Sequence, residues 1–213
     1  MIGGRNLEPT ARTTLTVTVG GVRELVKPLA PGPFLEFIPV PAVEAPAFVN
    51  DYFQIEVAAT PPVRVGVEQF DVSSARPIMG YGDGWHEEEF NPRTGMRWRW
   101  LSEKGELRLR MPTTALARLH LEGESPLKYF SRGSRLVVRA GSVVVFDKTL
   151  STEFSLDIPI DTDTRLLRAG PWTEETISLE TDQVFAPADR SRRSADRRHL
   201  GLRIFKCELR PAQ

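Results

Sequence analysis

The chain has one cysteine, Cys207, three histidines and no long apolar run among its 213 residues. A single cysteine cannot form an intrachain disulfide or a cysteine-rich zinc site. No segment approaches the roughly 20 apolar residues that a membrane helix needs, and the opening MIGGRNLEPTARTT lacks the apolar centre of a signal peptide. These absences predict a soluble protein of the cytoplasm or of the cytoplasmic face of a membrane, with no transmembrane segment of its own.

Net charge is also absent, because 28 lysines and arginines balance 28 aspartates and glutamates. No overall field therefore draws the chain to nucleic acid, and it lacks the broad basic surface with interleaved aromatics that nucleic-acid binders show. The basic residues are 23 arginines and only five lysines. Arginine suits bidentate contacts with carboxylates and phosphates, although a GC-rich genome would produce the same bias.

Helical periodicity is missing as well, and period-two alternation dominates instead. In ELRLRM (106–111) apolar residues alternate with charged ones, and MRWRW (96–100) repeats the pattern. Seventeen prolines and sixteen glycines fall mainly between such segments. This pattern predicts an all-β protein, an antiparallel β-sandwich of jelly-roll or Ig-like type.

The sequence contains an internal similarity at a shift of 121 residues. LTVTVGGVRELVKPL (15–29) aligns with LVVRAGSVVVFDKTL (136–150), FLEFIPV (34–40) with FSLDIPI (154–160), and RVGVEQF (64–70) with HLGLRIF (199–205). We therefore predict a tandem of a partial and a complete copy. The expected parts are a flexible N-terminal arm (1–12), a partial β-sandwich repeat (13–73) and a complete β-sandwich domain (76–213).

The two copies differ in what surrounds them. The first has no counterpart of residues 76–133, so we expect it to expose an apolar sheet face that the second domain or a partner covers. The second carries an insertion, FAPADRSRRSADRR (185–198), with five arginines. Long loops on a rigid sandwich often carry function.

Residues 76–213 resemble a non-catalytic C-terminal β-sandwich module of bacterial membrane glycosyltransferases. The likeness rests on GDGWHEEEFNPRTGMRWRW (82–100), the LRLRMP strand, and TDQVFAPADRSRRSADRRHLGLRI (181–204). Its matching positions are Gly84, Trp85, Glu88, Arg97, Trp98, Phe185, Pro187, Asp196, Arg198, Leu200 and Gly201. The chemistry of those enzymes resides in a membrane domain that has no match here. The resemblance therefore implies a non-catalytic sandwich that contacts glycans or neighbouring proteins.

The tryptophan-rich stretch offers one candidate site. Trp98 and Trp100 fall on the apolar side of an alternating strand and are expected in the core. Trp85 lies in a glycine-rich loop, so Trp85 and Tyr81 could form a stacking platform for a sugar ring, or Trp85 could cap the sandwich.

His86, next to Glu87, Glu88 and Glu89, resembles a metal site only superficially. Adjacent residues of an extended segment point to alternate sides, and zinc would need a second nitrogen or sulfur ligand. We expect no metal and no cofactor, and we expect Glu88 or Glu89 to pair with an arginine such as Arg97 or Arg99.

Catalytic patterns are weak elsewhere. Asp161 and Asp163 form an Asp-x-Asp, which fits a solvated turn better than a cation site because no nucleotide-binding pattern surrounds it. There is no Gly-x-Ser-x-Gly elbow, and Cys207 lies within a strand, where burial would make it inert. The sequence therefore predicts a protein that is not an enzyme.

The arginine-rich insertion is the main candidate for contact with a partner. Arg190, Arg192, Arg193 and Arg197 could hold phosphates, lipid head groups or carboxylates, while Asp196 and Arg198 are expected to form a structural ion pair. We predict a non-catalytic interaction module, an extrinsic accessory or scaffold subunit of a larger assembly such as a membrane protein complex. The alternative is a carbohydrate-binding module that uses Trp85 and Tyr81, and a nucleotide-sugar enzyme that uses Asp161 and Asp163 ranks last.

Overall fold

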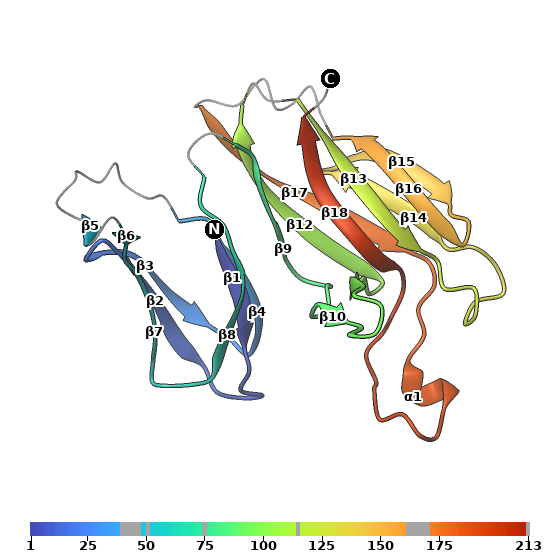
Figure 1. Cartoon of the computed structure of the whole chain (residues 1–213), viewed down its shortest axis with the longest axis horizontal. Coiled ribbons are helices and arrows are strands. Elements are labelled where there is room, and N and C mark those ends of the chain that lie inside the picture. The colour runs from blue at the N-terminus through green and yellow to red at the C-terminus, as the bar shows by residue number, and fades with distance from the viewer. Residues whose placement is uncertain (39–47, 50–51, 74–75, 114–115, 161–170, 212–213) are drawn as a thin grey trace. The chain divides into compact units, whose positions relative to one another are not determined.

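The computed structural model describes residues 1–38, 48–49, 52–73, 76–113, 116–160 and 171–211. Every strand pairing in these segments is antiparallel, and their single helix is the four-residue α1 (Pro187–Arg190) (Figure 1). The predicted all-β class is therefore confirmed. The chain divides into two compact units, unit 1 (Met1–Val72) and unit 2 (Ser73–Gln213).

Unit 1 contains two three-stranded sheets, with strand orders β4-β1-β8 and β3-β2-β7, and a two-stranded ribbon, β5-β6. The strands are β1 (Ile2–Asn6), β2 (Thr13–Val19), β3 (Val22–Leu29), β4 (Gly32–Glu36), β5 (Phe48–Val49), β6 (Tyr52–Phe53), β7 (Ile55–Thr60) and β8 (Val65–Phe70). Alternate residues of β2 point into a core shared by both three-stranded sheets. That core consists of Ile2, Leu15, Val17, Val19, Leu29 and Phe34.

The expected flexible arm at residues 1–12 is wrong, because β1 is the central strand of its sheet. Ile2 fills the core with 1% of its surface exposed. Asn6 ties the following residues down, since its side-chain amide donates to the Ala11 carbonyl at 2.8 Å and its side-chain oxygen accepts from the Glu8 amide at 3.1 Å. Unit 1 consequently has two sheets around a core of its own, so it is not the half-sandwich that the sequence suggested.

Unit 2 is a sandwich of two five-stranded sheets, with orders β10-β11-β18-β13-β16 and β15-β14-β17-β12-β9. Its strands are β9 (Ile78–Tyr81), β10 (Glu89–Phe90), β11 (Arg97–Trp100), β12 (Lys104–Pro112), β13 (Ala117–Glu124), β14 (Arg135–Ala140), β15 (Val143–Thr149), β16 (Glu153–Pro159), β17 (Trp172–Thr181) and β18 (Arg203–Pro211). The alternating stretch 106–111 lies in β12, where Leu107, Leu109 and Met111 are fully buried. The main core contains 18 buried residues from both sheets.

The pairing scheme of unit 1 recurs in unit 2. The orders β4-β1-β8 and β3-β2-β7 correspond to β16-β13-β18 and β15-β14-β17, with the strands in the same order along the chain. The register shifts between Val17 and Thr18 in β2 and, 121 residues later, between Val138 and Arg139 in β14. The duplication itself stays a prediction, but the shared scheme identifies β1 as the counterpart of β13.

A glycine occupies the same place in both copies of the scheme. Gly4 in β1 lies opposite Phe34, and Gly123 in β13 lies opposite Phe154. A Cβ on Gly4 would lie 1.9 Å from the Gly66 carbonyl oxygen, and one on Gly123 would lie 2.5 Å from that of Arg203. Both glycines sit at a register shift. Gly4 pairs with Val67 and Gly123 pairs with Ile204, so Val67 and Ile204 are equivalent. The sequence alignment had placed Val67 opposite Leu202, which is two residues away from the equivalent position.

Strands β9 to β12 have no counterpart in unit 1. They extend both sheets of unit 2, so that β12 pairs with β17 and β11 pairs with β18. The extension places the tryptophan-rich stretch at the end of unit 2 that also holds the arginine-rich insertion, which joins β17 to β18 (Figure 1). In the described parts of the chain, no helix is long and apolar enough to cross a membrane.

Candidate functional site

Three segments meet at one end of unit 2, which we call the loop end: residues 84–97, 125–133 and 182–199. Arg198 Nη2 donates to Glu89 Oε1 at 2.8 Å, and Arg190 Nη2 donates to the Tyr129 carbonyl at 3.3 Å. His86 Nε2 lies 2.9 Å from the His199 carbonyl oxygen. Because these contacts cross between all three segments, the loop end is one connected surface.

Of the two alternatives for Trp85, the structure agrees with the cap of the sandwich and not with the glycan platform. Trp85 is 3% exposed, belongs to the main core, and donates from Nε1 to the Glu106 carbonyl at 3.1 Å. Gly84 turns the chain inward with a φ of 78°, and a Cβ there would lie 1.7 Å from the Lys104 carbonyl oxygen. Trp85 therefore caps the sandwich and has no face available for stacking.

Tyr81 is half-buried and packs against the main core. Its ring meets Trp85 edge-on at 5.0 Å, and the Arg99 guanidinium covers it at 4.7 Å. Burial raises the pKa of the Tyr81 hydroxyl well above its usual range. Burial also raises the pKa of the Cys207 thiol to about 12, so Cys207 carries little thiolate near neutral pH.

A small aromatic cluster closes the base of the arginine-rich insertion. Trp100, Phe185 and Leu200 are buried together, with Trp98, Tyr129 and Phe130 packed against them. Phe185 stacks on Tyr129 with ring centroids 3.9 Å apart. Phe185 and Leu200 exchange two backbone hydrogen bonds, of 3.0 and 2.9 Å. Trp98 and Trp100 thus belong to this aromatic cluster. The backbone hydrogen bonds between Phe185 and Leu200 hold the two ends of the insertion together.

Arg198 organises the interior of the insertion. It forms the predicted ion pair with Asp196, whose carboxylate accepts from Arg198 Nε at 3.0 and 3.1 Å and from Nη2 at 2.8 Å. These hydrogen bonds lower the pKa of Asp196 and raise that of Arg198. Glu89, which also accepts from Trp98 Nε1 at 2.9 Å, links the same guanidinium to β10.

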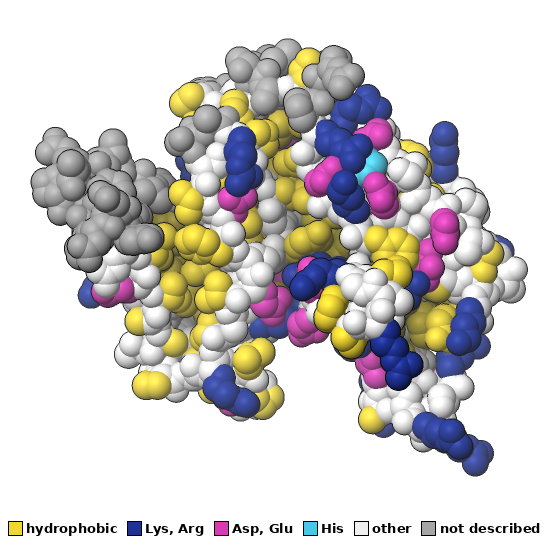
Figure 2. All heavy atoms as spheres, in the orientation of Figure 1, with side chains coloured by type: hydrophobic (Ala, Val, Ile, Leu, Met, Phe, Trp, Pro, Cys, Tyr) yellow, Lys and Arg dark blue, Asp and Glu magenta, His cyan; other side chains and the backbone are white. Residues whose placement is uncertain are grey.

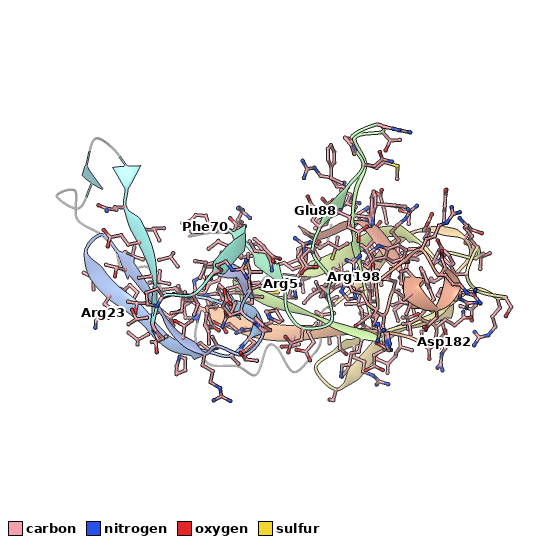
Figure 3. All side chains as sticks on the ribbon, turned by 90° about the horizontal axis from the view of Figure 1, so that it is seen from below. Arg5, Arg23, Phe70, Glu88, Asp182 and Arg198 are labelled. Carbon is pink, nitrogen blue, oxygen red and sulfur yellow. The ribbon has the colours of Figure 1, made fainter. Side chains whose placement is uncertain are left out.

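The acidic residues beside His86 have structural partners. Glu88 pairs with Arg97 at 2.5 Å, as the sequence suggested, and lies near the base of a hairpin that projects away from the sheets (Figure 3). His199 Nδ1 lies 2.5 Å from Glu103 Oε1. Burial raises the pKa of Glu103, but hydrogen bonds, including the one from His199, outweigh it and leave that pKa lowered. Within the segments that the structure describes, no group of three histidine, cysteine, aspartate or glutamate side chains is arranged to hold a metal ion.

Three arginines of the insertion have no partner in the part of the chain that the structure describes. Arg192, Arg193 and Arg197 are exposed, and their guanidinium groups make no hydrogen bond or ion pair with any described residue. In Figure 2 the lobe that holds α1 in Figure 1 presents Lys and Arg side chains at its outer surface. Arg190 instead borders an open pocket of about 340 Å³, lined by Val184, Phe185, Ala186, Asp189, Arg190 and His199.

Exposed apolar side chains at the loop end were not anticipated. Phe90 is 50% exposed, Met96 42% and Leu127 39%. Met96 was expected to share the apolar side of Trp98 and Trp100, but it lies in a turn, where Asn91 and Met96 are hydrogen-bonded. The turn-forming residues in NPRTG (91–95) could have indicated that the strand begins only after Met96. Asp161 and Asp163 lie outside the described residues.

Comparison with known proteins adds little. No protein-family model matches the chain, and no curated protein matches it in sequence. A solved structure titled as TmCBM61 in complex with beta-1,4-galactotriose matches at 11% identity, over 64% of this chain and 88% of that one, with a TM-score of 0.28. A likeness at this level carries no argument about function.

Proposed function

We propose that this chain is a non-catalytic β-sandwich interaction module, an extrinsic subunit that docks onto a larger assembly at a membrane. The observation that carries the proposal is a set of three exposed arginines with no partner among the described residues, on a loop clamped at its base: Arg192, Arg193 and Arg197. A clamped loop loses little conformational entropy on binding, and arginine is well suited to carboxylates and phosphates. The membrane setting comes from the resemblance in residues 76–213.

Two features support the non-catalytic part. The Cys207 thiol is half-buried against the core, and burial raises its pKa to about 12. At the loop end, His86 is held by a backbone carbonyl and His199 by Glu103. Among the described residues, neither imidazole is hydrogen-bonded to a serine, threonine or cysteine side chain that it could activate as a nucleophile. The carbohydrate-binding alternative is less well supported, because Trp85 is in the core and cannot stack on a sugar ring.

Native fractionation of membranes from the source organism tests the docking role. After gentle extraction, the chain should co-migrate with a large complex and leave it in a high-salt wash, because contacts between exposed charges are screened by salt. The double variant R192Q/R193Q should co-migrate less. The matched control is R12Q/R23Q, which removes two exposed arginines of unit 1 and leaves the loop end intact. Migration of the wild-type chain alone, at its own mass, would refute the proposal.

A further inference from the structure

The loop end carries positive charge although the whole chain has none. Arg93, Arg192, Arg193 and Arg197 are exposed, with no charged partner among the described residues, and Lys128 lies over the Tyr129 ring. The neighbouring carboxylates are mostly neutralised: Glu88 by Arg97, Glu89 and Asp196 by Arg198, and Asp182 by Arg132. The other carboxylates of the loop end are Glu87 and Asp189, which are fewer than its remaining lysine and arginine side chains. A surface of this kind attracts anions.

Each of two loops here places an apolar side chain beside a cation. Phe90 carries the Arg97 guanidinium over its ring at 4.8 Å, and Leu127 precedes Lys128. Met96, on the same hairpin as Phe90, is exposed as well. Backbone hydrogen bonds from Gly95 and Thr94 to the Asn91 carbonyl, at 2.9 and 3.3 Å, hold the turn of this hairpin. The apolar side chains are thus presented on a shaped turn.

We infer that the loop end binds an anionic lipid surface, with Arg192, Arg193 and Arg197 on the phosphates and Phe90 and Met96 at the boundary with the acyl chains. The inference rests on the proposed function, and it specifies an anionic lipid surface as the partner that the module contacts. A bilayer interface offers phosphates and apolar depth together, the two kinds of contact that the exposed cations and the exposed apolar side chains of the loop end could make. The open pocket beside Arg190 and His199 has room for a head-group phosphate.

Co-sedimentation of the full chain with vesicles tests the inference. The probes are phosphatidylcholine vesicles with and without roughly one third phosphatidylglycerol, at low and high salt. The chain should bind the anionic vesicles and leave them at high salt. R192Q/R193Q should bind about 25-fold more weakly, since each basic residue near an anionic surface contributes about 1 kcal/mol, or about fivefold. F90A/M96A should weaken binding to the same vesicles by roughly tenfold.

Matched controls separate the site from general charge and hydrophobicity. R12Q/R23Q removes two exposed arginines of unit 1, and V143A/V144A shortens two exposed valines that follow the far end of β14. Both should bind like the wild-type chain, and circular dichroism should show every variant folded. Equal binding of R192Q/R193Q and R12Q/R23Q, or equal binding to neutral vesicles, would overturn the inference.

The two proposals fail differently. If vesicles do not bind the chain but a membrane complex retains it through Arg192 and Arg193, the partner is an acidic protein; the lipid inference is then wrong and the docking role stands. If anionic vesicles bind the chain through the loop end while native fractionation finds it without a complex, the lipid inference stands and the subunit role is wrong.

Discussion

Unit 1 and unit 2 share a six-strand pairing scheme but differ in what is added to it. In unit 1, β7 and β8 are edge strands, and all of their residues are exposed or half-buried. In unit 2, the corresponding β17 and β18 are flanked by β12 and β11. Among the described residues, six buried side chains form the core of unit 1, against 18 in the main core of unit 2.

The difference shows that the same six-strand pairing scheme can form a small unit by itself or, with added strands, support the loop end. The extra strands of unit 2 convert edges into sheet interior and enlarge the core, which can then support long projecting loops. Unit 1 joins β7 to β8 by Pro61–Arg64, whereas unit 2 joins β17 to β18 through the arginine-rich insertion. The candidate site therefore belongs to the additions, and the shared scheme is its scaffold.

The largest expected effect comes from the matched core leucines Leu15 and Leu136, both 0% exposed. Leu136→Ala should lower the free energy of unfolding of unit 2 by about 4 kcal/mol, and Leu15→Ala that of unit 1 by about 3 kcal/mol, because the smaller core can collapse more readily around the cavity. Urea unfolding monitored by hydrogen exchange measures the free energy of unfolding of each unit separately. All four tryptophans lie in unit 2, so their fluorescence reports that unit alone.

Exposed Leu116 supplies the control, since it is 60% exposed and its replacement by alanine should change stability by under about 0.5 kcal/mol. If Leu15→Ala and Leu136→Ala behaved like Leu116→Ala, the two cores described above would be incorrect.

The matched glycines should give a somewhat smaller effect. Gly4→Ala and Gly123→Ala should each destabilise their own unit by about 2 to 3 kcal/mol, because the new methyl group would overlap a carbonyl oxygen of the neighbouring strand. Gly66→Ala is the control, since its Cβ would meet nothing closer than Leu7 at 3.8 Å. The same hydrogen-exchange experiment reads all three, and a tolerated Gly4→Ala would argue against β1 as a central strand.

The insertion has no counterpart in unit 1, and loss of its internal anchor should affect the loop alone. Arg198→Gln removes the contacts to Asp196 and Glu89 and should lower the free energy of local opening by about 1 to 2 kcal/mol, discounted for partial exposure. Trypsin should then cleave after Arg192 and Arg193 roughly tenfold faster. Arg197→Gln is the neighbouring control and should leave the rate unchanged. Equal rates in the two variants would mean that Arg198 does not anchor the loop.

The smallest effect is the response of the same loop to acid. Arg198 lowers the folded-state pKa of Asp196, so this pair contributes stability above the unfolded pKa of about 3.9 and loses it as pH falls through the lower folded value. Hydrogen exchange in residues 186–198 should therefore accelerate below about pH 4 relative to the core of unit 2. The additional acceleration should be missing in Arg198→Gln; if it persisted there, another group would be responsible.

Local patterns predicted the fold class and part of the site. Alternation in 106–111 predicted a strand with one buried side, and β12 is such a strand. Asp196 and Arg198 are two residues apart, so their pairing could be read from the chain. By contrast, β1 is five residues long with two glycines, which is too short and too glycine-rich to register as a strand.

The sequence by itself determined the strands, the turns and the place of the arginine-rich insertion, because side-chain alternation and turn residues act over a few neighbours. Only the tertiary structure decided which side chains are available. Trp85 is buried because Gly84 approaches the backbone at Lys104, and Arg198, already paired with Asp196, is held a second time by Glu89, which is 109 residues away in the chain. Arg192, Arg193 and Arg197 stay exposed because no described carboxylate lies within reach. Such outcomes depend on contacts between distant strands, which the sequence pattern does not encode locally.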